Sequence, residues 1–175
     1  MAEGAVLLRG FVGEVEAELI AALRDIVAAA PFRRMFTPGG HQMSVAMTNC
    51  GNAGWVTDHT GYRYNPDDPE TGKPWPAMPP LLRELADRAA ERAGFTGFAP
   101  DVCLINRYVP GARMSLHQDR DELDFAAPIV SVSLGLPAIF LFGGLKRNDK
   151  PRRLDRKSTR LNSSHERRSR MPSSA

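Results

Sequence analysis

The stretch "SLHQDRDE" places one histidine and two acids at alternate positions, His117, Asp119 and Asp121. On extended chain, side chains two residues apart point to the same side, so His117 and Asp119 can meet one ion. An imidazole paired with a carboxylate is typical of a non-haem Fe(II) centre, in which two histidines and one carboxylate leave the remaining positions open. Such a centre needs a third protein ligand, so the pair is an incomplete metal site. Taken alone, this signal is weak, and a loop histidine beside solvated acids is the favoured reading.

Two segments have the apolar spacing of packing helices. Residues 14–29 carry Val15, Leu19, Leu23, Ile26 and Val27 at helical intervals, and Pro31 is expected to end the helix. Residues 80–93 carry Leu82, Leu85 and Ala89 on one face, and Gly94 follows as a C-terminal stop.

From residue 101 the apolar pattern changes to the period of a strand. In "VCLINRY", Asn106 and Tyr108 fall on the same side as Leu104. The stretches "PIVSVSLG" and "AIFLFGG" read as two further short strands. Helices followed by several short strands predict a mainly β, α+β fold, an antiparallel sandwich or jelly roll with helices on one side.

The region between the two helices is rich in glycine and proline, which predicts short strands joined by long loops. Its aromatic side chains lie among turn residues and not in a regular core pattern. Loops of this kind often carry binding residues. The aromatics are Trp55, Tyr62, Tyr64 and Trp75.

The net charge of +3 over 175 residues is unevenly distributed. Residues 155–175 contain six basic and two acidic side chains, whereas the other 154 residues contain 17 and 18. The basic character therefore comes from the tail and is no evidence for nucleic-acid binding. The tail is rich in serine and arginine and poor in large apolar residues, so we expect it to be disordered.

Composition places the chain among single-domain globular proteins, since 42% of its residues are hydrophobic. No apolar run is long enough to span a bilayer, and the N-terminus lacks the features of a signal peptide. The two cysteines, Cys50 and Cys103, are expected to be reduced. These features predict a cytoplasmic protein that does not associate with membranes.

Five segments in order closely resemble bacterial members of the AlkB family of iron- and 2-oxoglutarate-dependent nucleic-acid demethylases. They are "FTPGGHQMSVAMTNCG", "GWVTDHTGYRY", "KPWPAMP", "CLINRYVPGARMSLHQDRDE" and "APIVSVSLGLPAIFLFGGLKRND", within residues 4–154. The resemblance implies a double-stranded β-helix, or jelly roll. It also implies Fe(II) as cofactor, with 2-oxoglutarate and O2 as cosubstrates.

Carried over residue by residue, the resemblance implies roles for eight side chains. His117 and Asp119 are the catalytic iron ligands, and Asn106 and Tyr108 contact 2-oxoglutarate. The substrate side is formed by Trp55 near the flipped methylated base, Tyr62 near the nucleic-acid backbone, Asp121 near the lesion's amine or charge, and Arg147. Each has a structural alternative: Asn106 and Tyr108 as barrel filling, Trp55 as a loop anchor, and Arg147 as a solvated turn charge.

The implied function is oxidative demethylation of N-alkylated bases, such as 1-methyladenine and 3-methylcytosine, which is direct repair of alkylation damage. The implied partner is single- or double-stranded DNA, or RNA, bound by a monomer. Two alternatives stay open: a nucleic-acid-binding remnant without activity, and a 2-oxoglutarate-dependent hydroxylase that acts on a protein or a small molecule.

The resemblance stops after Leu154, where the distal iron histidine and two 2-oxoglutarate-binding arginines are expected. The expected domain is therefore residues 1–154, with a nucleotide-recognition part over about 1–100 and a partial jelly roll over about 101–154. The tail, 155–175, is interpreted as a sequencing artefact, with a frameshift or a genuine basic tail as alternatives. His165 lies in "SSHERRS", without an apolar flank, and is not expected to be the third ligand. We therefore expect impaired iron binding and turnover.

Overall fold

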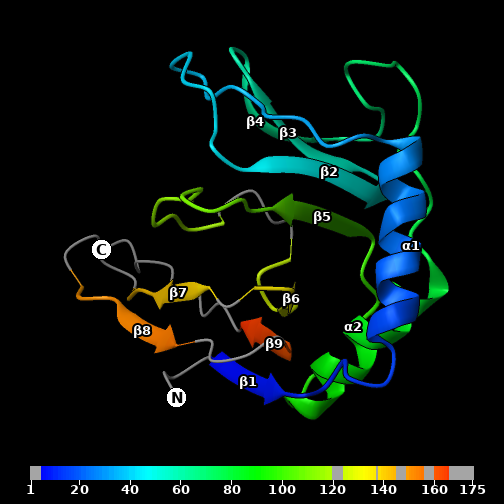
Figure 1. Cartoon of the computed structure of the whole chain (residues 1–175), viewed down its shortest axis with the longest axis vertical. Helices are drawn as coiled ribbons and strands as arrows, with labels where there is room; N and C mark the ends of the chain where they lie inside the picture. Colours follow the sequence, from blue (N-terminus) through cyan, green and yellow to red (C-terminus); the bar gives the residue numbers. More distant parts are fainter. Residues whose placement is uncertain (1–4, 120–123, 137, 145–148, 156–159, 166–175) are drawn as a thin grey trace, which may run out of the picture. The chain divides into compact units, whose positions relative to one another are not determined.

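The computed structural model describes residues 5–119, 124–136, 138–144, 149–155 and 160–165, with the backbone alone for 154–155 and 160–165. These residues form two helices among nine strands (Figure 1). In chain order the elements are β1 (Ala5–Arg9), α1 (Glu16–Ala29), β2 (Ala46–Gly51), β3 (Gly54–Asp58), β4 (Gly61–Asn65), α2 (Pro80–Arg92), β5 (Val102–Arg107), β6 (Ile129–Leu134), β7 (Ile139–Phe142), β8 (Arg152–Asp155) and β9 (Arg160–His165).

The chain divides into two compact units, which are described separately. The hairpin unit comprises Ala17–Arg83 and Ala99–Asp121, and the terminal unit comprises Met1–Glu16, Glu84–Phe98 and Glu122–Ala175. In the hairpin unit, β2 pairs with β5 and β3 pairs with β4, both antiparallel (Figure 1). Strand β3 also lies against β2 and β5, so these four strands form one framework.

The two faces of the β2–β5 pair enter two separate cores of the hairpin unit. On one face, Met47 and Leu104 contact the cluster that contains Val45, Val56 and Trp75. On the other face, Cys50 packs with Ile26 and Met78, against Cys103 and Ile105 of β5. The period of two expected for "VCLINRY" is therefore observed, since successive residues of β5 face different cores.

Both expected helices are present. Helix α1 buries Leu19 and Ile26 and ends directly before Ala30 and Pro31, close to the expected boundary. Helix α2 begins at Pro80, where a missing N–H costs no helical hydrogen bond. After α2, Gly94 has a φ of +93°, and the N–H of Phe95 donates to the carbonyl of Ala90. This is the glycine-ended helix stop that the sequence predicts.

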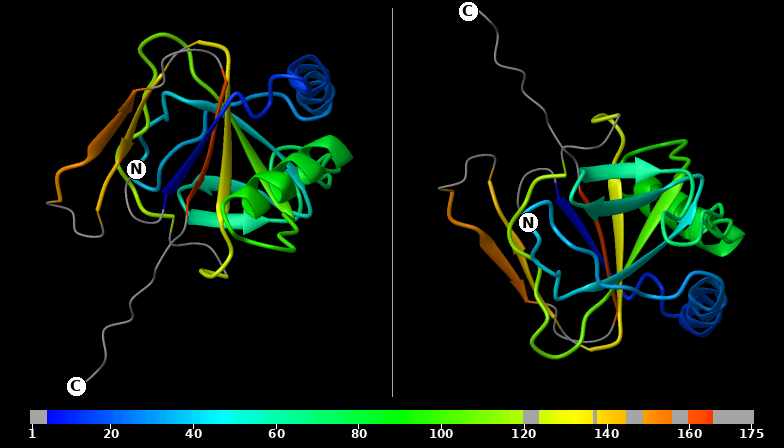
Figure 2. Two further views of the ribbon diagram at one scale, coloured as in Figure 1. Left: turned by 90° about the horizontal axis from the view of Figure 1, so that it is seen from below. Right: turned by 90° about the horizontal axis from the view of Figure 1, so that it is seen from above.

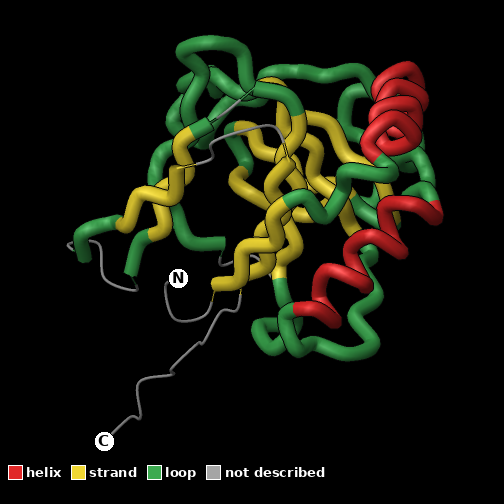
Figure 3. Tube along the Cα trace, turned by 60° about the horizontal axis from the view of Figure 1, so that its bottom comes forward, coloured by secondary structure: helices red, strands yellow, loops and turns green. Residues whose placement is uncertain are grey.

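The terminal unit contains a three-stranded antiparallel sheet in the order β1-β9-β6, visible as neighbouring ribbons in Figure 2. A second pair joins β7 to β8. Figure 3 shows how much of the described chain is strand and loop and how little is helix. Strands β1, β8 and β9 were not anticipated from the sequence.

Strand β9 lies within the tail that the sequence predicts to be disordered. The backbone of Arg160–His165 pairs with β1 on one side and with β6 on the other. Pairing of this kind uses main-chain N–H and C=O groups, which any non-proline residue supplies, so it does not require the apolar side chains that the tail lacks.

Cys50 and Cys103 face each other as register partners across β2 and β5, and both are free thiols. The hydrogen bond to Cys103 and burial raise the pKa of Cys50, so this side chain stays a thiol. Within the described residues, no helix is both long and apolar enough to cross a membrane.

Candidate functional site: an aromatic hairpin and a histidine–aspartate pair

The β3–β4 hairpin presents two stacked aromatic rings. Trp55 of β3 and Tyr62 of β4 have ring centroids 5.6 Å apart and an interplanar angle of 24°. They lie diagonally across the antiparallel pair, because Tyr62 is the register partner of Thr57 and not of Trp55. Tyr62 is 50% exposed and Trp55 is partly buried, so the pair offers aromatic surface to solvent. A surface of this type can stack on a nucleic-acid base.

A fully buried asparagine fixes the backbone of Trp55. The N–H of Trp55 donates to Oδ1 of Asn49 (3.0 Å), and Nδ2 of Asn49 donates to the carbonyl of Trp55 (3.1 Å). Asn49 lies on β2 and has no exposed surface. Both ends of its amide are therefore used in one reciprocal contact, which sets the position of Trp55 relative to the β2–β5 pair.

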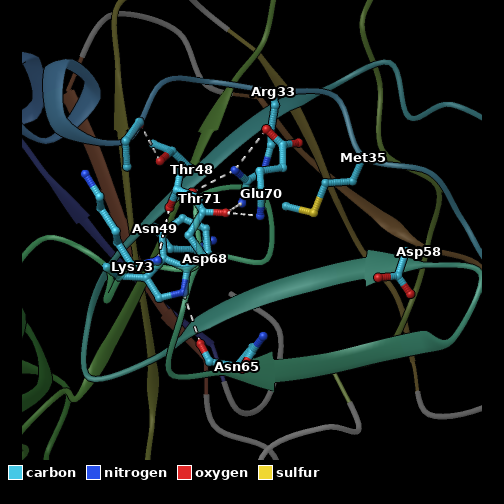
Figure 4. Close-up of polar contacts among 12 residues, drawn as sticks. Arg33, Met35, Thr48, Asn49, Asp58, Asn65, Asp68, Glu70, Thr71 and Lys73 are labelled. Carbon is cyan, nitrogen blue, oxygen red and sulfur yellow. Dashed lines mark hydrogen bonds and ion pairs between the residues drawn. The ribbon is translucent and has the colours of Figure 1, made fainter.

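A second support lies on the far end of the hairpin, among the residues of Figure 4. The guanidinium of Arg33 donates from Nη1 to Oδ2 of Asp68 (2.9 Å), and its Nη2 lies 2.6 Å from Oδ1 as an ion-pair contact without hydrogen-bond alignment. Arg33 also lies over the ring of Trp75, 5.1 Å from the centroid. Trp75 in turn donates from Nε1 to the carbonyl of Asn65, the last residue of β4 (3.0 Å).

This network keeps the carboxyl of Asp68 ionised. Burial by itself raises the pKa of the Asp68 carboxyl, but hydrogen bonds from Arg33 and from the N–H of Glu70 outweigh it, so the pKa is lowered. The loop that connects β4 to α2 is thus held by an ionised, largely buried carboxylate.

The histidine–aspartate pair lies on a different kind of structure. Residues 108–119 form neither helix nor strand, apart from one turn in which the N–H of Ala112 donates to the carbonyl of Val109. His117 Nε2 lies 3.2 Å from Asp119 Oδ1, and their side chains are 53% and 46% exposed. Two residues apart in the chain, these side chains therefore lie side by side, as predicted.

The arrangement of His117 and Asp119 fits two ligands of one metal ion. Nδ1 of His117 lies 2.8 Å from the carbonyl oxygen of Ser115. Because a carbonyl only accepts, Nδ1 is the donor in this contact, and Nε2 is the nitrogen that faces Asp119, which is the usual orientation of a metal-binding histidine. Two ligand atoms with bonds of about 2.1 Å lie about 3 Å apart when the angle between the bonds is near 90°.

Asn106 and Tyr108 lie at the end of β5 and just beyond it. Asn106 is the register partner of Met47, and it shares its side of β5 with Leu104. Both residues are exposed, Tyr108 by 52%. Exposure at a strand end is consistent with contact to a small molecule.

One apolar cluster joins the three parts of the candidate site. Trp55, Leu104 and Met114 all pack against the core that contains Val45, Met47 and Val56. Trp55 belongs to the aromatic hairpin, Leu104 precedes Asn106 by two residues, and Met114 precedes His117 by three. The hairpin unit therefore holds the three segments around one core.

Asp121 and Arg147 lie outside the described residues. His165 ends β9 in the terminal unit, with Ala5 and Ile129 as register partners. Where the structure describes the chain, no group of three His, Cys, Asp or Glu side chains could hold a metal ion.

Sequence reasoning missed the side chains that position the site. An asparagine inside the strand "AMTNCG" was a usable signal for Asn49, because a buried amide needs partners. Two further residues have no comparable signal in the sequence: Met114, which packs the segment of His117 against the core, and Ser44, which hydrogen-bonds to that segment.

The chain belongs to the 2OG-Fe(II) oxygenase superfamily, whose family model matches residues 4–164. Within that superfamily, its relatives are AlkB proteins. "Alpha-ketoglutarate-dependent dioxygenase AlkB" of Escherichia coli (strain K12) is 61% identical over 154 residues, which cover 88% of this chain and 71% of the relative. "Nucleic acid dioxygenase ALKBH1" of Mus musculus is 39% identical over 98 residues, or 55% of this chain and 25% of that protein.

A solved structure shares the fold. The structure of OsALKBH1 superimposes with a TM-score of 0.79 over 94% of this chain and 80% of that chain, at 23% identity. Together with the superfamily match, this confirms the expected jelly-roll class for a chain of mostly strands with two helices. The superfamily also establishes the chain as a member of the Fe(II)- and 2-oxoglutarate-dependent dioxygenases, with the cofactors that the family name states.

Proposed function

We propose that this chain is an oxidative demethylase of N-alkylated bases, such as 1-methyladenine and 3-methylcytosine, in DNA or RNA. The observation that carries the proposal is the presence, around one core, of an exposed aromatic stack and a paired histidine and aspartate. The names of the E. coli and mouse relatives, an α-ketoglutarate-dependent dioxygenase and a nucleic acid dioxygenase, support both halves of it.

Each of the proposed site residues would have its own role. His117 Nε2 and an Asp119 carboxylate oxygen would hold Fe(II), and Asn106 and Tyr108 would contact 2-oxoglutarate. When bound, the iron and 2-oxoglutarate supply the power to oxidise an N-methyl group with O2. Trp55 and Tyr62 would receive the target nucleotide after it leaves the base stack, which offsets part of the unstacking cost.

Asp121 and Arg147 complete the proposed substrate side. A carboxylate at Asp121 would favour cationic lesions such as 1-methyladenine and 3-methylcytosine over neutral bases, because opposite charges attract most strongly where water is excluded. The proposal also includes a monomer in the cytoplasm that accepts single- or double-stranded substrate.

The test is release of formaldehyde from an oligonucleotide that carries 1-methyladenine, with and without Fe(II) and 2-oxoglutarate. We expect release that requires both and disappears in His117→Ala and in Asp119→Ala. Because the sequence resemblance stops before a distal histidine, we expect the rate to be well below that of the E. coli relative. A rate equal to that relative's would overturn the expectation of impaired turnover.

The same assay separates the alternatives. Binding of the oligonucleotide without formaldehyde release would identify a nucleic-acid-binding remnant. Consumption of 2-oxoglutarate only with a peptide or small molecule would identify a hydroxylase of another substrate. Either result would remove the proposed function.

A further inference from the structure

Ser44, which is not one of the proposed metal ligands, forms hydrogen bonds with the segment that carries His117 and Asp119. The Oγ–H of Ser44 donates to the carbonyl oxygen of Arg113 (2.8 Å), and the N–H of Arg113 donates to the same Oγ (3.1 Å). One hydroxyl thus satisfies both main-chain groups of one residue. The contact joins residues 69 positions apart in the sequence, so it is a tertiary connection and not a local turn.

Both ends of this contact are anchored to the core of the hairpin unit. Ser44 is followed by Val45, which is 1% exposed and belongs to the main apolar cluster. Arg113 is followed by Met114, which packs against the same cluster. The hydroxyl therefore connects the segment to a point two residues before β2, which begins at Ala46.

The Ser44–Arg113 contact lies close to the proposed ligands along the chain. Arg113 precedes Ser115 by two residues, and the carbonyl of Ser115 accepts from Nδ1 of His117. The segment forms no helix or strand here, so its course depends on contacts of this kind. If the backbone of Arg113 moved, the carbonyl of Ser115 would move with it. The imidazole of His117, which is bonded to that carbonyl, would then change its orientation.

We propose that Ser44 is a positioning residue, which holds residues 113–119 so that His117 Nε2 and the Asp119 carboxylate face one metal ion. This inference rests on the proposed function, because it takes His117 and Asp119 as iron ligands. Ser44 itself is not one of the proposed ligands, and its hydroxyl contacts the main chain of Arg113. Its effect passes through the backbone, in the way that outer contacts orient the ligands of metal sites.

The exposure of Ser44 makes the proposal testable without loss of the fold. The hydroxyl lies at the surface, and its removal leaves Arg113 N–H and C=O able to bond to water. The Ser44→Ala variant should therefore keep the melting temperature of the parent chain and lose only the tether. A purely structural role predicts the reverse, a lower melting temperature and an unchanged affinity of the folded protein for metal.

The experiment uses the full chain and two measurements that need no turnover. Hydrogen exchange of a peptide covering residues 110–119 follows the Arg113 amide, and calorimetric titration with Mn(II), an ion that avoids oxidation during the assay, follows the ligand pair. In Ser44→Ala we expect exchange about tenfold faster and Mn(II) affinity about fivefold weaker. A tenfold change corresponds to about 1.4 kcal/mol, within the range of two hydrogen bonds.

Two variants serve as controls. Ser44→Thr keeps the hydroxyl and should restore both values. Thr37→Ala removes a hydroxyl whose contact is local, since Thr37 Oγ1 accepts only from the N–H of His41 four residues away among the described contacts. It should leave exchange and affinity unchanged.

Three outcomes would overturn the proposal: exchange and Mn(II) affinity in Ser44→Ala equal to the parent, equal losses in Ser44→Thr and Ser44→Ala, or an affinity loss that follows a lower melting temperature. An inactive parent chain would refute the proposed function and leave these measurements intact, so the two failures are distinguishable.

Discussion

The aromatic hairpin and the segment that carries the histidine–aspartate pair are held in opposite ways. Strands β3 and β4 rest on buried polar contacts, with Asn49 under Trp55 and the Arg33–Asp68 pair beside Trp75. The segment from Val109 to Asp119 is exposed over much of its length. Its contact with Ser44 is made through one hydroxyl at the surface.

The difference follows from what each region has to do. A stacking surface must exist before the base arrives, because a rigid platform loses less entropy on binding. A pair of metal ligands, in contrast, also gains order from the ion when it binds, since metal binding contributes to the free energy of folding around it. We therefore expect substitutions under the hairpin to lower global stability, and substitutions near the ligand pair to change metal affinity with little effect on stability.

The largest effect is expected at Asn49. Asn49→Ala removes both partners of the Trp55 backbone and leaves a partly buried N–H and a partly buried C=O without these hydrogen bonds. At 1–3 kcal/mol for each such group, we expect the free energy of unfolding to fall by about 3 kcal/mol. Urea denaturation followed by tryptophan fluorescence measures it.

Asn52→Ala is the matched control, because Asn52 lies nearby on the same stretch but is exposed. Its free energy of unfolding should stay within about 0.5 kcal/mol of the parent. Equal losses in the two variants would mean that the hairpin is not fixed through Asn49.

The next effect is expected at Asp68, and it depends on pH. Asp68→Asn keeps the shape of the side chain but removes its charge, and we expect a loss of about 2 kcal/mol at pH 7, the range of hydrogen bonds to charged groups. The pKa of Asp68 is lowered in the folded chain, so its contribution is fully present above the unfolded value of about 4.

As pH falls below about 4 toward the lowered folded pKa, the parent binds a proton and loses this contribution, whereas the variant does not. The difference in unfolding free energy between parent and Asp68→Asn should therefore shrink on acidification. Urea denaturation at pH 7, 4 and 3 tests it, and a difference that stays constant would contradict the assigned ion pair.

The sequence predicted the parts of the molecule whose signal is local. The helical spacing around Leu19 and Ile26, the glycine stop at Gly94 and the alternation of "VCLINRY" each depend on residues close together in the chain. The approach of His117 to Asp119 is of the same kind, because the two residues are only two positions apart in the chain.

What could not be predicted depends on distant partners. Ser44 and Arg113 meet across 69 positions, and nothing in either neighbourhood identifies the other. Strand β9 was missed for a related reason, since its pairing with β1 and β6 uses the backbone and leaves little trace in side-chain pattern.

A smaller effect is expected on the aromatic surface itself. Tyr62→Ala removes half of the Trp55–Tyr62 stack, and base stacking on an aromatic contributes ~1–3 kcal/mol in proteins that bind single strands. We expect affinity for a methylated oligonucleotide to fall about tenfold, near the lower end of that range. Fluorescence anisotropy measures it, and Tyr62→Phe, which keeps the ring, should bind nearly as well as the parent.

The smallest effect on stability is expected at the turn of the same hairpin, where an ion pair is exposed. Hydrogen bonds from Arg63 first, and then from Thr60, hold the pKa of Asp58 well below its usual range. In Arg63→Gln this pKa should rise toward its ordinary value without reaching it, because both donors of Thr60 remain. Side-chain carboxyl chemical shifts followed over pH measure the change.

The urea midpoint of Arg63→Gln should stay close to that of the parent at pH 7, because water and salt screen exposed pairs. A large drop in the midpoint would show that the turn, and not only the buried contacts of Asn49 and Asp68, fixes the hairpin. Exposed contacts would then stabilise the hairpin as much as the buried contacts do. Exposure alone would no longer explain why substitutions near His117 are expected to leave global stability unchanged.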